Sequence, residues 1–105
     1  MSKVKITVIK KFSPIDVFGH EIYSSAGKKI TECRAFDLGQ EFFVDSINNM
    51  PEGFCSWAWR DIYKDLSVLC FNGNFSNEYH KEGTQHTSCS DGRKPVCFEL
   101  ERISD

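Results

Sequence analysis

The feature that most constrains the fold is a long stretch with helical periodicity between Phe54 and Phe71. At about 100° per residue, its main apolar side chains fall on one face of roughly 100°. These residues are Cys55, Trp59, Ile62, Leu66, Leu69 and Cys70. Such a face is buried against another layer, so the stretch predicts one principal helix packed on a sheet. Gly73 predicts a left-handed cap that ends this helix.

Alternating apolar and polar residues predict the partner layer, an antiparallel sheet of about four strands. Residues 3–11 alternate cleanly and residues 40–44 predict a second strand. The segments 85–89 and 94–103 flank Asp91-Gly92, and Asp-Gly is a strong hairpin signal. The order strand, irregular segment, strand, helix, hairpin predicts an α+β fold. The length of 105 residues predicts a single domain, 1–105.

Two segments have no regular period. Residues 12–32 carry Pro14, Gly19 and Gly27, and only one short helical turn is expected, within 14–23. Irregular stretches of this length often cover a site or contact a partner. Residues 75–84 are polar and predict a loop, with His80 at the surface.

Composition excludes some partners. The net charge of −2 lacks the basic footprint of a nucleic-acid-binding protein. No apolar run approaches the roughly 20 residues of a membrane span, and Lys3, Lys5 and Thr7 interrupt any secretory leader. A cytoplasmic protein is therefore expected. The five cysteines are then thiols and not a disulfide framework.

Cys33, Cys55 and Cys89 are the candidate site residues, because each stands beside a turn or a helix start. We expect them to converge near the amino end of the helix, where the helix dipole stabilises a thiolate. Such a cluster suits zinc or another thiolate-bound metal, with His86 or solvent as a further ligand. No spacing between successive cysteines matches the knuckle of about two to four residues in structural zinc modules. The alternative is three separate buried cysteines.

The other two cysteines and the helix carboxylates have simpler interpretations. Cys70 is expected to be a buried hydrophobe, and Cys97 an outward thiol that alternates with glutamates. Asp61 and Asp65 are one turn apart and are expected on a solvated charged face.

Trp57 is expected on the polar side of the helix, about 160° from Trp59. Its predicted neighbours there are Asp61, Lys64 and Val68. A large apolar side chain in this position is expected to be shielded from water by another part of the protein or by a partner. Either residues 12–32 form a lid over it, or it belongs to an interface, which predicts at least a homodimer.

Several strings resemble a family of small uncharacterised prokaryotic proteins of about this length. They are the opening "VKITV", "C..F..GQEF", "MPEGFCSWAW.DI" and "C.DG..PV.F.LERI". The resemblance implies that Cys33, Cys55 and Cys89 belong to the shared pattern, whereas Cys70 and Cys97 do not. Arg34 and Ser56 stand where the family has proline, and Lys94 holds the place of the family's arginine. The family has no assigned activity.

Three classes of function follow. The first is a thiol or metal site formed by Cys33, Cys55 and Cys89. The second is a binding or assembly module that uses the face around Trp57, with Asp61 and Lys94. The third, an enzyme with Cys55 as nucleophile, ranks last because no base accompanies the cysteine. Substrate and cofactor stay open.

Overall fold

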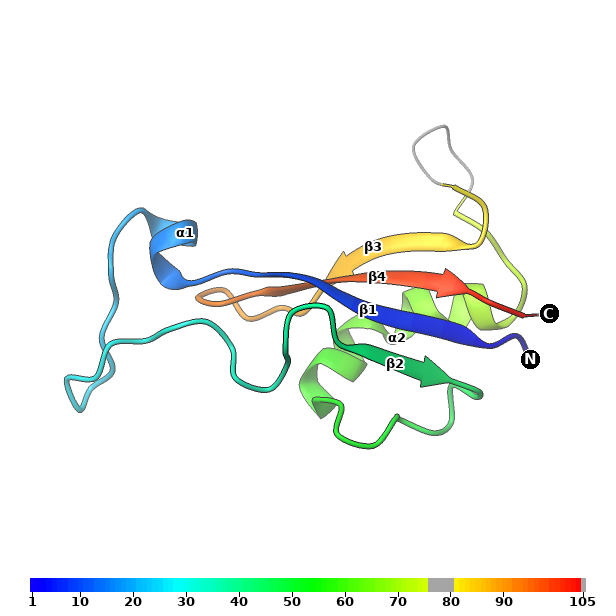
Figure 1. Cartoon of the computed structure of the whole chain (residues 1–105), viewed down its shortest axis with the longest axis horizontal. Helices are drawn as coiled ribbons and strands as arrows, with labels where there is room; N and C mark the ends of the chain where they lie inside the picture. Colours follow the sequence, from blue (N-terminus) through cyan, green and yellow to red (C-terminus); the bar gives the residue numbers. More distant parts are fainter. Residues whose placement is uncertain (76–80, 105) are drawn as a thin grey trace.

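The protein is a two-layer structure in which one antiparallel sheet carries the long helix on a single face (Figure 1). The computed structural model describes residues 1–75 and 81–104, so His80 and part of the predicted 75–84 loop lie outside the described residues. The described part holds β1 (Val4–Lys11), α1 (Pro14–Phe18), β2 (Glu41–Val44), α2 (Ser56–Cys70), β3 (Thr84–Ser88) and β4 (Val96–Arg102). The predicted α+β fold is confirmed. In the described ranges, neither helix has the length and apolar character of a membrane-crossing segment.

The sheet has the order β2-β1-β4-β3 with every neighbouring pair antiparallel. In this register, Ile6 of β1 lies opposite Phe42 of β2 and Leu100 of β4. The pairing of β1 with β4 shifts between Val8 and Lys10. The predicted clean alternation of residues 3–11 is therefore wrong beyond Val8, because a bulge inserts an extra residue into the strand.

An aromatic core lies between the sheet and α2. The rings of Phe36, Phe42, Phe54 and Phe98 pack with centroids 4.9 to 5.9 Å apart. Most of these pairs are edge-on, the geometry that aromatic quadrupoles favour. Aliphatic side chains of β1, α2 and β4 complete the core, and Phe36 ties the segment before β2 to it.

The core face of α2 differs in part from the predicted one. Its predicted aliphatic residues are buried, while Trp59 is only half-buried against Phe54 and Tyr63. The expected solvated position of Asp65 is wrong, because this residue is only 3% exposed. Its Oδ1 accepts a hydrogen bond from Nζ of Lys64 at 3.1 Å, which compensates for the burial.

The carboxyl end of α2 closes in a Schellman motif. The Asn72 N–H donates to the Leu69 carbonyl at 3.1 Å, and the Gly73 N–H donates to the Val68 carbonyl at 2.8 Å. Asn72 adopts the left-handed conformation with φ 65°, so the prediction that Gly73 would do so is wrong. A Cβ at Gly73 would meet the Val68 oxygen at 2.9 Å, so this glycine serves close backbone approach.

The predicted hairpin forms between β3 and β4, but Asp91-Gly92 does not make a two-residue turn. The last ladder bond runs from the Cys89 N–H to the Val96 carbonyl at 3.0 Å, leaving residues 90–95 as a longer loop. Within it, Asp91 Oδ1 accepts the N–H groups of Arg93 and Lys94 at 2.9 and 3.1 Å. The aspartate thus folds the loop through its side chain.

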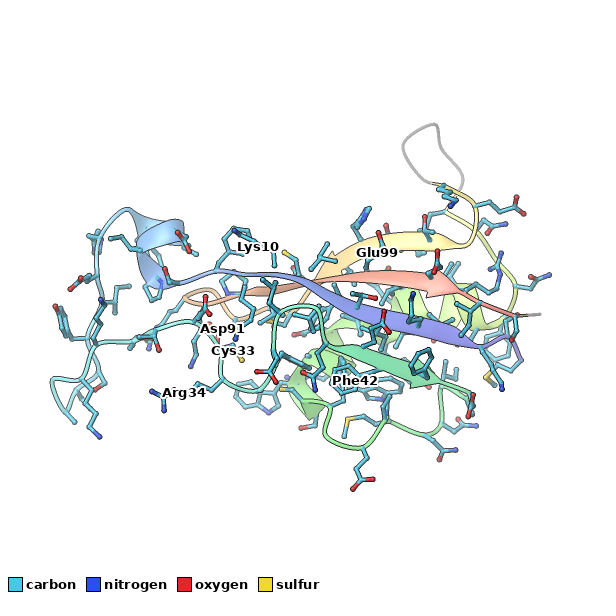
Figure 2. All side chains as sticks on the ribbon, viewed as in Figure 1. Lys10, Cys33, Arg34, Phe42, Asp91 and Glu99 are labelled. Carbon is cyan, nitrogen blue, oxygen red and sulfur yellow. The ribbon has the colours of Figure 1, made fainter. Side chains whose placement is uncertain are left out.

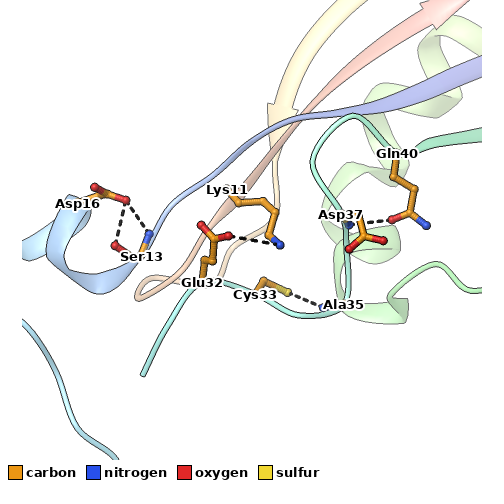
Figure 3. Close-up of polar contacts among 8 residues, drawn as sticks. All are labelled: Lys11, Ser13, Asp16, Glu32, Cys33, Ala35, Asp37 and Gln40. Atoms are coloured by element: carbon orange, nitrogen blue, oxygen red, sulfur yellow. Dashed lines mark hydrogen bonds and ion pairs between the residues drawn. The ribbon is translucent and has the colours of Figure 1, made fainter. Parts of the chain in front are cut away.

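Residues 12–35 form an arm that projects from one end of the sheet (Figure 1). The Cα radius of gyration is 15.0 Å, whereas a compact chain of this length has about 13 Å. The short helix α1 appears in the arm as predicted. The lid hypothesis is wrong, because Trp57 remains 73% exposed. The arm instead returns along β1, where Lys11 Nζ and Glu32 Oε1 form an ion pair at 3.6 Å (Figure 3).

Candidate thiol site

A cavity of about 70 Å³ lies beside the amino end of α2. All six residues predicted for a site line this cavity: Cys33, Cys55, Cys89, Trp57, Asp61 and Lys94. The other lining residues are Phe36, Ala58, Ser90 and Asp91. The fold therefore brings cysteines from three distant segments to the lining of one cavity. We call this space the thiol cavity.

Three different elements position the sulfur atoms. Cys33 lies on the returning part of the arm, just before the buried Phe36. Cys55 is the N-cap residue of α2, one position earlier than the predicted first turn. Cys89 directly follows β3, and Figure 2 shows Cys33 close to Asp91 of the same loop. The cavity thus lies where the arm, the helix start and the β3–β4 loop meet.

Backbone donors orient two of the three sulfur atoms. The Ala35 N–H donates to Cys33 Sγ at 3.4 Å (Figure 3). The Val96 N–H donates to Cys89 Sγ at 3.3 Å. Cys55 makes no side-chain capping hydrogen bond, although its carbonyl accepts the Trp59 N–H at 2.9 Å. The Cys55 thiol therefore lies at the positive end of the helix dipole and does not accept a capping hydrogen bond.

The two aspartates of the thiol cavity have structural partners. Asp61 Oδ2 accepts the Ser90 N–H at 2.7 Å and the Ser90 hydroxyl at 2.9 Å. This pair of bonds fastens the β3–β4 loop to α2, so the expectation of a merely solvated Asp61 is wrong. The sequence analysis did not identify Ser90 as a residue of the cavity. Its position directly after Cys89 was the one feature of the sequence that pointed to it. Lys94 is half-buried at the opposite end of the same loop.

The remaining candidate residues lie elsewhere. Cys70 is buried as expected, and burial raises the pKa of its thiol against a smaller opposing effect of the amino-terminal charge. Cys97 is half-buried, and burial followed by the nearby Cys89 raises the pKa of its thiol. His86, proposed as a further ligand, contacts Glu99 Oε2 at 3.2 Å on the outer face of the sheet. None of these three residues lines the thiol cavity.

The thiols should therefore differ in reactivity. We expect Cys70 to be alkylated at least about tenfold more slowly than Cys55 at pH 7, because the thiolate is the nucleophile and burial disfavours it. The raised pKa values of Cys70 and Cys97 also predict that their alkylation rises at a higher pH than that of an ordinary thiol. A time course with iodoacetamide, followed by peptide mass spectrometry, measures each rate. In urea, where both thiols are exposed, the two rates should be similar. Similar rates in the folded protein as well would contradict this expectation.

The donor set of the thiol cavity fits a soft metal by its chemistry, because thiolates are the ligands such ions prefer. Across residues 1–75 and 81–104, however, no three His, Cys, Asp or Glu side chains are already arranged to hold a metal ion. Comparisons with protein-family models, curated proteins and solved structures found no match for this chain. The resemblance to small prokaryotic proteins stays a prediction.

Proposed function

We propose that this protein binds a soft metal ion, such as zinc, through Cys33, Cys55 and Cys89. One observation carries the proposal: three thiols from distant segments line a single cavity of about 70 Å³. Core packing alone does not call for cysteine, since aliphatic side chains fill space as well. A water-sized sphere occupies roughly 10–15 Å³, so the cavity suits an ion with a few solvent molecules better than an organic substrate.

The surroundings of the sulfur atoms support this proposal. Backbone N–H groups already donate to Cys33 and Cys89, and such hydrogen bonds tune thiolate ligands in metal proteins. Lys94 and the amino end of α2 supply positive charge opposite three thiolates. Tetrahedral thiolates at a Zn–S distance of about 2.3 Å stand roughly 4 Å apart.

A cadmium titration of the reduced protein under anaerobic conditions tests the proposal. We expect one ion per chain, with the ultraviolet charge-transfer band of thiolate-bound cadmium, and zinc competing for the same site. Replacing Cys33, Cys55 or Cys89 with Ser should each lower the affinity by about 100-fold or more, since loss of a ligand exceeds the 10–100-fold cost of losing its supporting partner.

Cys97→Ser is the matched control, because Cys97 is also half-buried but lies outside the thiol cavity. This variant should keep the wild-type affinity. The proposal is wrong if the wild-type protein shows no charge-transfer band, or if Cys97→Ser weakens binding as much as Cys55→Ser does.

A second candidate function, assembly through the Trp57 face, has its own supporting observation. Trp57 is the most exposed large apolar side chain of the described residues, and the Arg60 guanidinium lies over its ring at 5.9 Å. Tryptophan and arginine are the residues most enriched at energetically important positions of interfaces. This face, with Asp61 and Lys94 beside it, supports a homo-oligomer.

The enzyme hypothesis has less support. A nucleophilic Cys55 needs a general base, and no histidine among residues 1–75 and 81–104 lines the thiol cavity. The carboxylates of Asp61 and Asp91 are engaged in holding the β3–β4 loop. We therefore rank this class last.

A further inference from the structure

We infer that two copies of this chain pair antiparallel through the outer stripe of α2, a row of side chains pointing away from the sheet. The inference rests on the second proposed function, assembly through the Trp57 face, and specifies its geometry. The stripe comprises Trp57, Asp61, Lys64, Val68 and Phe71, which recur at helical spacing and fall within about 40° of one line.

The outer stripe is exposed apolar surface at both ends and charged in the middle. Trp57 is 73% exposed, and Phe71 and Val68 are 65% and 36% exposed at the other end of α2. Between them, Asp61 and Lys64 lie one helical turn apart. The sheet covers the opposite side of α2, where Leu66 is buried (Figure 1). A helix face with this pattern is suited to another helix.

The stripe is complementary to itself when a two-fold axis passes between Ile62 and Tyr63. Trp57 of one copy then lies level with Val68 of the other, and Asp61 lies level with Lys64. Each contact occurs twice, as an isologous interface requires. A parallel pairing in register would instead place Asp61 on Asp61 and Lys64 on Lys64, and like charges in contact are unfavourable. The charge pattern therefore selects the antiparallel arrangement.

A groove beside Trp57 extends this interface. The groove has a volume of about 520 Å³, and its lining includes Phe18 of α1, Arg60 and Arg93. In the antiparallel register, Phe71 of the second copy lies level with Phe54, about one helical turn before Trp57, and it extends the apolar contact around Trp57. A specific interface buries about 1,000 Å² in total, and a helix stripe reaches such an area more readily with this added contact.

The pairing also affects the thiol cavity. Trp57 lines both the groove and the thiol cavity, as do Ser90 and Asp91. A second copy seated on Trp57 therefore lies over one wall of the thiol cavity. The dimer would limit access of bulky thiol reagents to Cys55 while leaving room for an ion.

Sedimentation equilibrium over a range of concentrations, with reductant and a chelator present, tests the assembly itself. We expect a dimer for the wild-type protein and at least about tenfold weaker association for Trp57→Ala, as for an interface anchor. Phe43→Ala is the matched control, because Phe43 is an aromatic residue 56% exposed on the other face of the sheet. A wild-type protein that stays monomeric at millimolar concentration overturns both the assembly and the pairing.

Charge exchange tests the antiparallel register separately. Asp61→Lys and Lys64→Asp should each weaken self-association, because each places like charges opposite one another. Mixed together, the two variants should form a one-to-one heterodimer, since a chain with lysine at both positions then faces a chain with aspartate at both. Two results would overturn the register while leaving assembly through Trp57 in place. One is that both variants still dimerise as tightly as the wild-type protein; the other is that their mixture forms no heterodimer.

Asp61 also fastens Ser90, and Lys64 pairs with the buried Asp65, so thermal melting must show that Asp61→Lys and Lys64→Asp are both folded. Val68→Glu provides a variant that leaves both contacts intact. It places a carboxylate level with Trp57 of the second copy and should weaken association about as much as Trp57→Ala does. Unchanged association of Val68→Glu would overturn the register even if Asp61→Lys does not fold.

Discussion

Replacing Leu66 with Ala lowers the free energy of unfolding by about 2–5 kcal/mol, the range of large-to-small substitutions in a packed core. Leu66 is fully buried on α2, among core side chains contributed by β1 and β4. The substitution removes apolar contacts and leaves a cavity that the surrounding sheet fills only in part. Urea denaturation followed by circular dichroism measures the change.

Val68→Ala serves as the control for this experiment, because Val68 is on the same helix but 36% exposed. At protein concentrations low enough to keep the chain monomeric, its cost should stay below about 1 kcal/mol. A loss of less than about 0.5 kcal/mol for Leu66→Ala would show that α2 buries a different face.

Replacing Arg102 with Ala is expected to cost about 2–3 kcal/mol, because hydrogen bonds from a charged donor are lost at the carboxyl end of α2. One guanidinium nitrogen of Arg102 donates to the Leu69 carbonyl at 3.2 Å and to the Gly73 carbonyl at 2.6 Å. The other donates to Asn74 Oδ1 at 2.8 Å. The cation also lies at the negative end of the helix dipole. The midpoint of urea unfolding reports the loss.

Arg102→Lys and Arg93→Ala complete this test. Lysine keeps the charge but not the planar fork, so Arg102→Lys should fall between wild type and Arg102→Ala. Arg93 is exposed on the β3–β4 loop, and its removal should change stability by no more than about 0.5 kcal/mol. Equal effects of Arg102→Ala and Arg93→Ala would mean that the guanidinium bonds do not stabilise the helix end.

Local periodicity determined the elements of this protein and their buried faces. The alternation along β1 up to Val8 and along β4, and the helical spacing of Ile62, Leu66 and Leu69, are properties of neighbouring residues, so they can be read without the fold. The same holds for α1, which Pro14 and Gly19 delimit. The turns beside Cys33, Cys55 and Cys89 can likewise be recognised in the sequence, whereas the shared lining of one cavity depends on how the three segments pack.

Only the tertiary structure decided which distant residues contact and hydrogen-bond one another. Arg102 caps a helix that ends 32 positions earlier in the chain, and Asp61 holds Ser90 across a separation of 29 residues. Asp65 is buried and the arm leaves Trp57 uncovered, although the residues around both positions look polar in the sequence. Hydrogen bonds and burial at these positions depend on which surfaces meet, and periodicity within one segment contains no information about its partner.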